Sequence, residues 1–211
     1  MLYLIDSANK KHIEEALSLG VYGITANTTM YRKENTNVTA FIQEYSTHTV
    51  SFLSAEVIGT YDEMLIQAHQ HLQVDKGIII KINFSIDGLK LVNTLHAQGY
   101  KTALTLVFTV SQAMAAINVL ADYIFFFIGR NEEYGQDALS SIASIQQIID
   151  KKQYTTKLVC ASIKNMFQLE KLAQLSIDYA ALPYDLFLKS LHHPLSEQGA
   201  QVFIDDFHHI S

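Results

Sequence analysis

The feature that most constrains this chain is a regular alternation of short apolar runs with segments whose apolar residues recur at helical spacing. Short runs rich in Val, Ile and Phe are typical of buried β-strands, and a period near 3.6 is typical of helices. Helical faces lie between the runs, as in Ile13, Ala16 and Leu17. The predicted strands are Leu2–Asp6, Gly23–Ala26, Phe52–Val57, Gly77–Ile82, Thr102–Val107, Tyr123–Ile128, Lys157–Ala161 and Tyr179–Leu182.

Strands that alternate with helices pair in parallel through right-handed crossovers. Eight such units in 211 residues predict an α/β fold, a closed (β/α)8 TIM barrel at the small end of its size range. The alternative is an open doubly wound sheet, which requires a glycine-rich phosphate turn after its first strand. That turn reads Ser7-Ala8-Asn9-Lys10 and contains no glycine. The barrel is therefore the favoured fold.

The chain length suits a single domain, and no Gly/Ser linker divides it, so we expect one barrel domain over 1–211. Ser85 is predicted to cap one of the helices, and Gly99 to end it. The segment 195–210 has the pattern of an extra C-terminal helix. It carries more apolar residues than a free tail needs, namely Val202, Phe203, Ile204 and Phe207.

Charge and composition limit the expected partners and location. The net charge is −6 and the basic residues form no run, so neither nucleic acid nor an anionic membrane is an expected partner. No apolar run approaches the roughly 18 residues of a membrane span, and the N-terminal MLYLIDSANK lacks a signal peptide's basic n-region. The single cysteine, Cys160, fits a reducing cytoplasm and reads as a buried inert thiol, with a nucleophile as the alternative.

One lysine lies inside a predicted buried strand. Gly77–Ile82 reads GIIIKI, and Lys81 interrupts its β-branched residues near the C-terminal end. Burial of an unpaired ammonium is unfavourable, and a protein usually avoids it by lowering the lysine pKa. A neutral lysine attacks carbonyl carbons and forms Schiff bases. The alternative is a lysine that is ion-paired or that extends its charge to solvent.

A barrel enzyme builds its site from inward-pointing residues at the C-terminal ends of the strands. Because side chains alternate along a strand, Asp6 shares a face with Leu2 and Leu4, and Glu56 shares a face with Phe52 and Ser54. The same alternation pairs Ile79 with Lys81 and Ala103 with Thr105. The predicted inner face therefore combines, at one height, the side chains of Asp6, Glu56, Lys81 and Thr105.

These four groups are the parts of a class I aldol reaction. Lys81 would attack a ketose carbonyl, and the protonated imine would accept electrons from the breaking C–C bond. Asp6 would take the proton of the neighbouring hydroxyl, while Glu56 and Thr105 would hold a proton-shuttling water. The alternative role of Asp6 and Glu56 is to compensate the charge of Lys81. Imine formation replaces Lewis-acid activation, so we expect no cofactor and no metal.

The histidines are predicted to lie on the surface rather than at a metal site. His69 and His71 are two residues apart on a predicted helix and cannot share a face. The remaining pairs stand near the C-terminus, at His192–His193 and His208–His209.

Several segments of the chain, taken in order, resemble a known family. They are LYLIDSA at 2–8, GITAN at 23–27, SAEV at 54–57, IIIKIN at 78–83, TLVFTVSQA at 105–113, FFIGR at 126–130, VCASIKN at 159–165 and ALPYD at 181–185. As a set they resemble the transaldolase family, within its short microbial branch that includes fructose-6-phosphate aldolase. The resemblance covers essentially the whole chain.

The resemblance implies a Schiff-base role for Lys81 and an acid/base role for Asp6. It implies that Asn27 orients the substrate and that a sugar phosphate binds at three later positions; Arg and Lys after strands six and seven suit a phosphate dianion. The positions implied for substrate binding are Asn27, Thr25, Phe127, Arg130, Ser162 and Lys164. In short members the C-terminal tail packs on a neighbouring subunit, often in a ring-like decamer, so we expect a homo-oligomer, either a pentamer or a decamer.

Two positions bear on reaction type. Transaldolases resemble this chain in carrying Glu and Phe where it has Glu56 and Phe127, whereas the fructose-6-phosphate aldolase branch has Gln and Tyr. Phe127 has no hydroxyl to help protonate the bound three-carbon intermediate, which favours transfer to an aldehyde over simple cleavage. The resemblance therefore implies transfer of a dihydroxyacetone unit between sugar phosphates, with reversible cleavage or a non-catalytic sugar-phosphate-binding barrel as alternatives.

The chain departs from the family pattern around the donor pocket. The family's Thr-Thr-Asn-Pro-Ser turn appears as Thr25-Ala26-Asn27-Thr28-Thr29, which loses a hydroxyl and a rigidifying proline. Larger transaldolases carry asparagine in place of Ala103 and serine in place of Phe125, and Phe126 replaces a usual proline. These changes predict a narrower or more apolar donor pocket.

Overall fold

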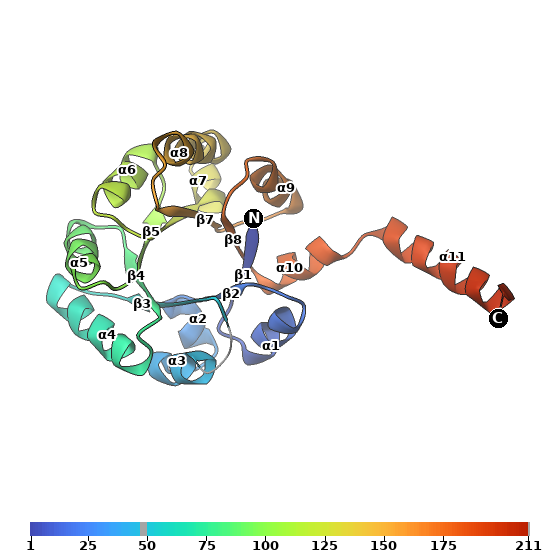
Figure 1. The fold of residues 1–211 in the computed structure, drawn as a ribbon, viewed down its shortest axis with the longest axis horizontal. Helices are drawn as coiled ribbons and strands as arrows, with labels where there is room; N and C mark the ends of the chain where they lie inside the picture. The colour runs from blue at the N-terminus through green and yellow to red at the C-terminus, as the bar shows by residue number, and fades with distance from the viewer. Residues whose placement is uncertain (47–49, 211) are drawn as a thin grey trace.

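Within residues 1–46 and 50–210, which the computed structural model describes, eight parallel strands close into a barrel surrounded by helices (Figure 1). The strands follow one another around the ring in chain order, and β8 pairs with β1 through Ala181 and Leu4, so the sheet has no edge. The predicted (β/α)8 barrel is confirmed. The strands are β1 Leu2–Asp6, β2 Gly23–Thr25, β3 Phe52–Val57, β4 Ile79–Asn83, β5 Thr102–Val107, β6 Tyr123–Phe127, β7 Lys157–Ala161 and β8 Tyr179–Leu182.

The helices pack their apolar faces on the outside of the barrel, where Ile13 of α1 and Ile142 of α8 are fully buried. The short helix α7 begins directly after the end of β6, and α2 begins three residues after the end of β2, so both bring helix starts to the rim of the barrel. The helices are α1 Lys10–Ser18, α2 Thr28–Lys33, α3 Val38–Ser46, α4 Tyr61–Val74, α5 Ile86–Ala97, α6 Val110–Asn118, α7 Ile128–Glu133, α8 Ala138–Lys152, α9 Met166–Gln174, α10 Tyr184–Leu191 and α11 Pro194–Ile210.

The barrel interior changes from apolar to polar along β3. Phe52 packs against the rings of Tyr123 and Tyr179, at centroid distances of 5.0 and 5.7 Å. Two and four residues further along β3 come Ser54 and Glu56, which share this inner face because strand side chains alternate. The apolar interior thus supports polar side chains at the C-terminal ends of several strands, namely β1, β3, β4 and β5.

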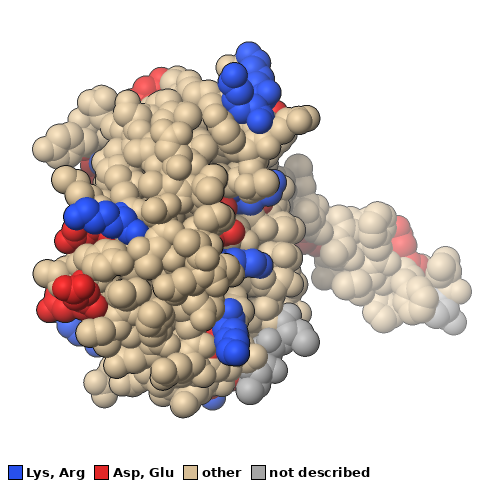
Figure 2. Space-filling view, turned by 60° about the vertical axis from the view of Figure 1, so that its left-hand side comes forward, with Lys and Arg blue, Asp and Glu red and all other residues tan. Residues whose placement is uncertain are grey.

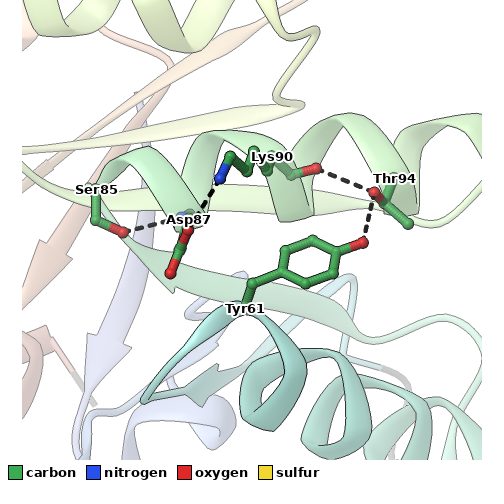
Figure 3. Close-up of polar contacts among 6 residues, drawn as sticks. Tyr61, Ser85, Asp87, Lys90 and Thr94 are labelled. Carbon is green, nitrogen blue, oxygen red and sulfur yellow. Dashed lines mark hydrogen bonds and ion pairs between the residues drawn. The ribbon is translucent and has the colours of Figure 1, made fainter.

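Capping contacts fix the start of α5 against the end of β4 (Figure 3). The Ser85 side chain accepts a hydrogen bond from the N–H of Gly88 at 2.9 Å, as the sequence predicted. A Cβ on Gly88 would lie 2.3 Å from the carbonyl oxygen of Asn83, so only glycine permits this close approach. On the same helix Thr94 contacts Tyr61 of α4, with 3.0 Å between the hydroxyl oxygens. These contacts hold the chain that follows Lys81.

The last helix, α11, extends away from the barrel (Figure 1). None of its residues is buried. Its large apolar side chains are open to solvent, with Phe203 75% and Phe207 62% exposed. The extra C-terminal helix is confirmed, and it begins at Pro194, one residue before the predicted segment.

The prediction for one histidine is wrong. His71 is only 7% exposed, because it lies on the face of α4 that packs on the barrel. Burial lowers the pKa of His71. His69 and the two C-terminal pairs are exposed, as expected. In the described ranges no group of three or more His, Cys, Asp or Glu side chains is placed to hold a metal ion.

Charged side chains are dispersed over the face shown in Figure 2, where Lys and Arg stand singly or in small groups among Asp, Glu and uncharged residues. Some form surface ion pairs, such as Lys157 with Asp178 at 3.0 Å. No helix in the described part of the chain is both long and apolar enough to cross a membrane. Cys160 is buried in β7, and burial raises the pKa of its thiol, as befits an inert side chain.

Candidate active site

A cavity of about 380 Å³ opens at the C-terminal ends of the barrel strands. Its wall includes the side chains of Asp6, Glu56, Lys81 and Thr105, which come from strands β1, β3, β4 and β5. The strand alternation read from the sequence therefore brings these four groups into one wall. Of the residues implied for substrate binding, the wall also contains Thr25, Asn27, Phe127 and Arg130.

Lys81 is a nearly buried residue of the cavity wall. It is only 4% exposed, and its Nζ donates a hydrogen bond to the carbonyl oxygen of Ala26. The ring centroid of Phe125 lies 5.7 Å from Nζ. Loss of solvent lowers the pKa of Lys81, while the nearby charges of Glu56 and Asp6 act in the opposite direction. Desolvation prevails, which favours the neutral, nucleophilic amine.

Asp6 ends β1 and is partly exposed to the cavity. Burial raises the pKa of its carboxyl group from 3.8 to about 6; the positive charge of Lys81 lowers this pKa, and the negative charge of Glu56 raises it further. A carboxylate with a pKa this close to neutrality is suited to accept and return a proton. Thr105, at 2% exposure, is the register partner of Asn83 on the neighbouring strand.

Glu56 is held by the start of α2. Its Oε2 accepts a hydrogen bond from the backbone N–H of Thr28 at 2.9 Å, and the residue is 8% exposed. Asn27 caps the same helix, because its Oδ1 accepts from the N–H of Met30 at 3.1 Å. The amide nitrogen of Asn27 therefore remains available as a donor towards the cavity.

Thr25 is buried at the end of β2, beside β3. Its hydroxyl oxygen accepts a hydrogen bond from the hydroxyl of Ser54 at 2.9 Å, so the Thr25 proton is free to be donated. Ser54 is the inward residue that precedes Glu56 on β3. This hydroxyl pair lies under the cavity and gives its floor hydrogen-bonding capacity.

Arg130 and Lys164 lie on the exposed rim. The Arg130 guanidinium stacks 5.1 Å from the ring centroid of Phe127. Gly129 donates its N–H to the carbonyl of Ser162 at 2.9 Å, and a Cβ on this glycine would lie 2.6 Å from Lys164 Cε. The β6 and β7 loops therefore touch here, although Ser162 and Lys164 are outside the cavity wall itself.

Comparison with known proteins adds to this geometry. The family described as "Transaldolase/Fructose-6-phosphate aldolase" matches residues 3–210. The chain belongs to this family. It is 33% identical over 209 residues to a "Probable transaldolase" of Geotalea uraniireducens (strain Rf4), and 36% identical over 209 residues to one of Streptococcus pyogenes serotype M2 (strain MGAS10270). Each alignment covers 98% of both chains.

The site departs from the transaldolase family pattern at the residues noted in the sequence. Ala26 lacks a hydroxyl, yet its carbonyl oxygen is what contacts Lys81. Thr28 retains the N–H that a proline would lack, and this N–H binds Glu56. Phe125 is only 2% exposed and lines the cavity, so an aromatic ring bounds the cavity beside Lys81.

One residue of this transaldolase-family site went unassigned in the sequence. Asn83 lines the cavity, two residues after Lys81 on β4. Its Oδ1 is buried and has no hydrogen-bond partner. A buried acceptor without a donor is unfavourable unless a ligand supplies the donor. The strand alternation that identified Lys81 could also have pointed to Asn83, since the two share a face.

Proposed function

We propose that this protein is a transaldolase that works through a Schiff base on Lys81. The observation that carries the proposal is a nearly fully buried lysine whose pKa is lowered, in a cavity shared with the carboxyl groups of Asp6 and Glu56. Membership of the family, and relatives named probable transaldolases, support the reaction class.

In the proposed reaction, the neutral amine of Lys81 adds to the C2 carbonyl of a ketose such as fructose 6-phosphate, and the carbonyl oxygen takes up a proton. The carbinolamine then loses its hydroxyl as water, after that oxygen receives a proton through a water held by Glu56 and Thr105. A protonated imine remains, which withdraws electrons from the neighbouring C3–C4 bond.

Asp6 removes the proton from the C4 hydroxyl, and the electrons of the C3–C4 bond move into the imine. An aldose phosphate leaves as the aldehyde, and a dihydroxyacetone unit remains on Lys81 as an enamine. The enamine carbon then attacks the aldehyde of an acceptor, whose oxygen takes back the proton of Asp6. Hydrolysis of the new imine releases the product ketose and the free amine.

The aromatic ring at the cavity rim favours transfer over simple cleavage. Phe127 lies in the wall of the cavity and has no hydroxyl with which to protonate the enamine. Without that proton the intermediate persists until an acceptor arrives. The alternative within the same chemistry is a simple aldolase, and Phe125 keeps open a second alternative, a barrel that binds sugar phosphates without turnover, because its ring bounds the donor pocket.

The proposed substrates are sugar phosphates. Arg130 and Lys164 lie on touching loops beside the cavity mouth, and two neighbouring cations suit a phosphate dianion. Asn27, Thr25 and Ser162 would contribute polar contacts to the same ligand. A cytoplasmic role in carbohydrate metabolism, such as the pentose phosphate pathway, fits these substrates.

We further propose that the protein is a homo-oligomer, a pentamer or a decamer, assembled through α11. A helix with large apolar side chains that buries nothing on its own barrel is expected to pack on another surface. A second copy of the chain supplies such a surface.

Borohydride trapping tests the function. The protein is incubated with fructose 6-phosphate, reduced and mapped by peptide mass spectrometry, with Lys81→Met as the matched variant. A reduced adduct on Lys81 that is absent from the variant supports the Schiff base. An adduct on neither protein, with fructose 6-phosphate and dihydroxyacetone both tried, would favour the binding-only alternative.

A further inference from the structure

The turn formed by residues 26–28 contacts two charged side chains on neighbouring strands, Glu56 and Lys81. Glu56 of β3 and Lys81 of β4 are register partners, so their side chains leave adjacent positions on the inner face. No salt bridge joins them in the ranges that the structure describes. Lys81 Nζ instead donates to the carbonyl of Ala26, and Glu56 Oε2 accepts from the N–H of Thr28. One turn thus binds both charged groups, through backbone atoms of two residues that are two positions apart, Ala26 and Thr28.

The Thr28 N–H is available because of how α2 begins. The first N–H groups of a helix have no partner within the helix. The Asn27 side chain takes the N–H of Met30, and the Asn27 carbonyl takes the N–H of Tyr31. Thr28, at the first helical position, is left to donate outwards, and Glu56 is its acceptor. Glu56 is nearly buried, so water competes little for this bond.

We propose that in this chain, which has Thr28 where its family usually has proline, the backbone N–H of Thr28 is a positioning group for the proposed Schiff-base reaction: it holds Glu56 Oε2 away from Lys81 and leaves Oε1 to the reacting water. The role rests on the proposed function. In the step concerned, Glu56 passes a proton through that water to the carbinolamine hydroxyl. The C–O bond then breaks, water leaves, and the nitrogen lone pair forms the C=N bond.

The contact matters because of the alternative that it prevents. A carboxylate released from Thr28 can turn towards its register partner, Lys81, and pair with the ammonium form. Such a pair raises the pKa of Lys81 and lowers the fraction of nucleophilic amine. Loss of the hydrogen bond from Thr28 to Glu56 should therefore slow imine formation at neutral pH, and should shift the pH profile of imine formation to higher pH.

The test compares Thr28→Pro with Thr28→Ala. Both variants remove the threonine side chain, but only proline removes the N–H, and the first helical position tolerates proline well. We measure single-turnover imine formation by borohydride trapping with fructose 6-phosphate from pH 6 to pH 9. T28P should form the imine roughly tenfold more slowly than T28A at neutral pH, the size expected for loss of a charge-assisted hydrogen bond, with a profile displaced to higher pH.

The same pair of variants in a Glu56→Ala background is the decisive control. In the Glu56→Ala background, T28P and T28A should have nearly the same trapping rate and nearly the same urea midpoint of unfolding. A difference of unchanged size would show that proline acts through the shape of the loop, and would overturn the proposal. Equal trapping rates for T28P and T28A with Glu56 present would overturn it too.

The unfolding measurement separates this proposal from the proposed function, because it needs no turnover. A wild-type protein that yields no Lys81 adduct overturns the proposed function and the catalytic role of the contact together. A wild-type protein that does yield the adduct, with no coupling between Thr28 and Glu56 in either measurement, overturns the positioning role alone.

Discussion

Asp6 and Lys81 share one cavity wall, and burial moves their pKa values towards each other. The pKa of Asp6 rises to about 6, and that of Lys81 falls below its usual range. In each case desolvation is the largest cause, and it disfavours the charged form. Burial therefore places a carboxyl group that titrates close to neutral pH beside an amine with a larger neutral fraction than an exposed lysine, as a Schiff-base aldol reaction requires.

The first prediction concerns pH and Asp6. Because the Asp6 pKa is about 6, the rate of C–C cleavage should rise with pH up to about pH 6 and then level until another group titrates. Asp6→Asn should remove most cleavage, by roughly 10²-fold or more, while Lys81 is still trapped by borohydride. Steady-state pH profiles and adduct mapping measure the two effects. Loss of the adduct together with cleavage would contradict an acid/base role for Asp6.

The same carboxyl group should affect stability. Its pKa in the folded protein is raised from 3.8 to about 6, so its stabilising contribution is complete below about pH 4 and is lost as pH rises through 6. Asp6→Asn should therefore be more stable than wild type at pH 7 to 8, by at most about 3 kcal/mol. Urea unfolding at pH 4 and pH 8 checks the sign. An equal difference at both values would show that ionisation is not its source.

The second substitution tests the choice between transfer and cleavage. Phe127→Tyr places a hydroxyl at the cavity wall, where it can protonate the enamine. The ratio of cleavage without acceptor to transfer with acceptor should rise, by roughly tenfold if general acid catalysis becomes available. Phe127→Leu is the matched control, since it alters the ring without adding a hydroxyl. A ratio that does not change in the tyrosine variant would remove the argument for a transaldolase over an aldolase.

Phosphate binding can be tested at Gly129 and Arg130. A Cβ on Gly129 would lie 2.5 Å from the carbonyl oxygen of Ser162 and 2.6 Å from Lys164 Cε, so Gly129→Ala should displace the loop that carries Ser162 and Lys164. Both Gly129→Ala and Arg130→Ala should raise KM for phosphorylated substrates several-fold, in line with the loss of a charge-assisted contact. Trapping of unphosphorylated dihydroxyacetone should change much less. A uniform loss for both substrates would point to a damaged barrel rather than a phosphate site.

How far the sequence leads can be judged from particular residues. Side chains alternate along a strand, and this alternation alone identified four inward polar residues, namely Asp6, Glu56, Lys81 and Thr105. The structure brings all four into one cavity wall. Their chemical roles stay predictions. The contact from Thr28 to Glu56 could not be read from side-chain patterns, because the donor is a backbone N–H whose freedom depends on the geometry of a helix start. The arrangement of the loops likewise decides that Lys164 stays outside the cavity wall.

The surface of α11 carries the last prediction. None of its residues is buried in the single chain, so its apolar side chains remain exposed. If they form a subunit interface, a chain that ends at His193 should sediment as a smaller species, with its barrel still folded by circular dichroism. Phe203→Asp should weaken assembly in the same direction, because Phe203 is 75% exposed in the single chain and a charge at an apolar interface is unfavourable.

Ser196→Asp is the matched control, as it adds the same charge to the exposed first turn of this helix. Sedimentation velocity over a range of protein concentrations separates the outcomes. A wild-type protein that sediments as a monomer at every concentration, or a truncated chain that keeps the wild-type size, would show that α11 does not hold copies together. The exposed apolar face would then have to serve a contact with a different protein.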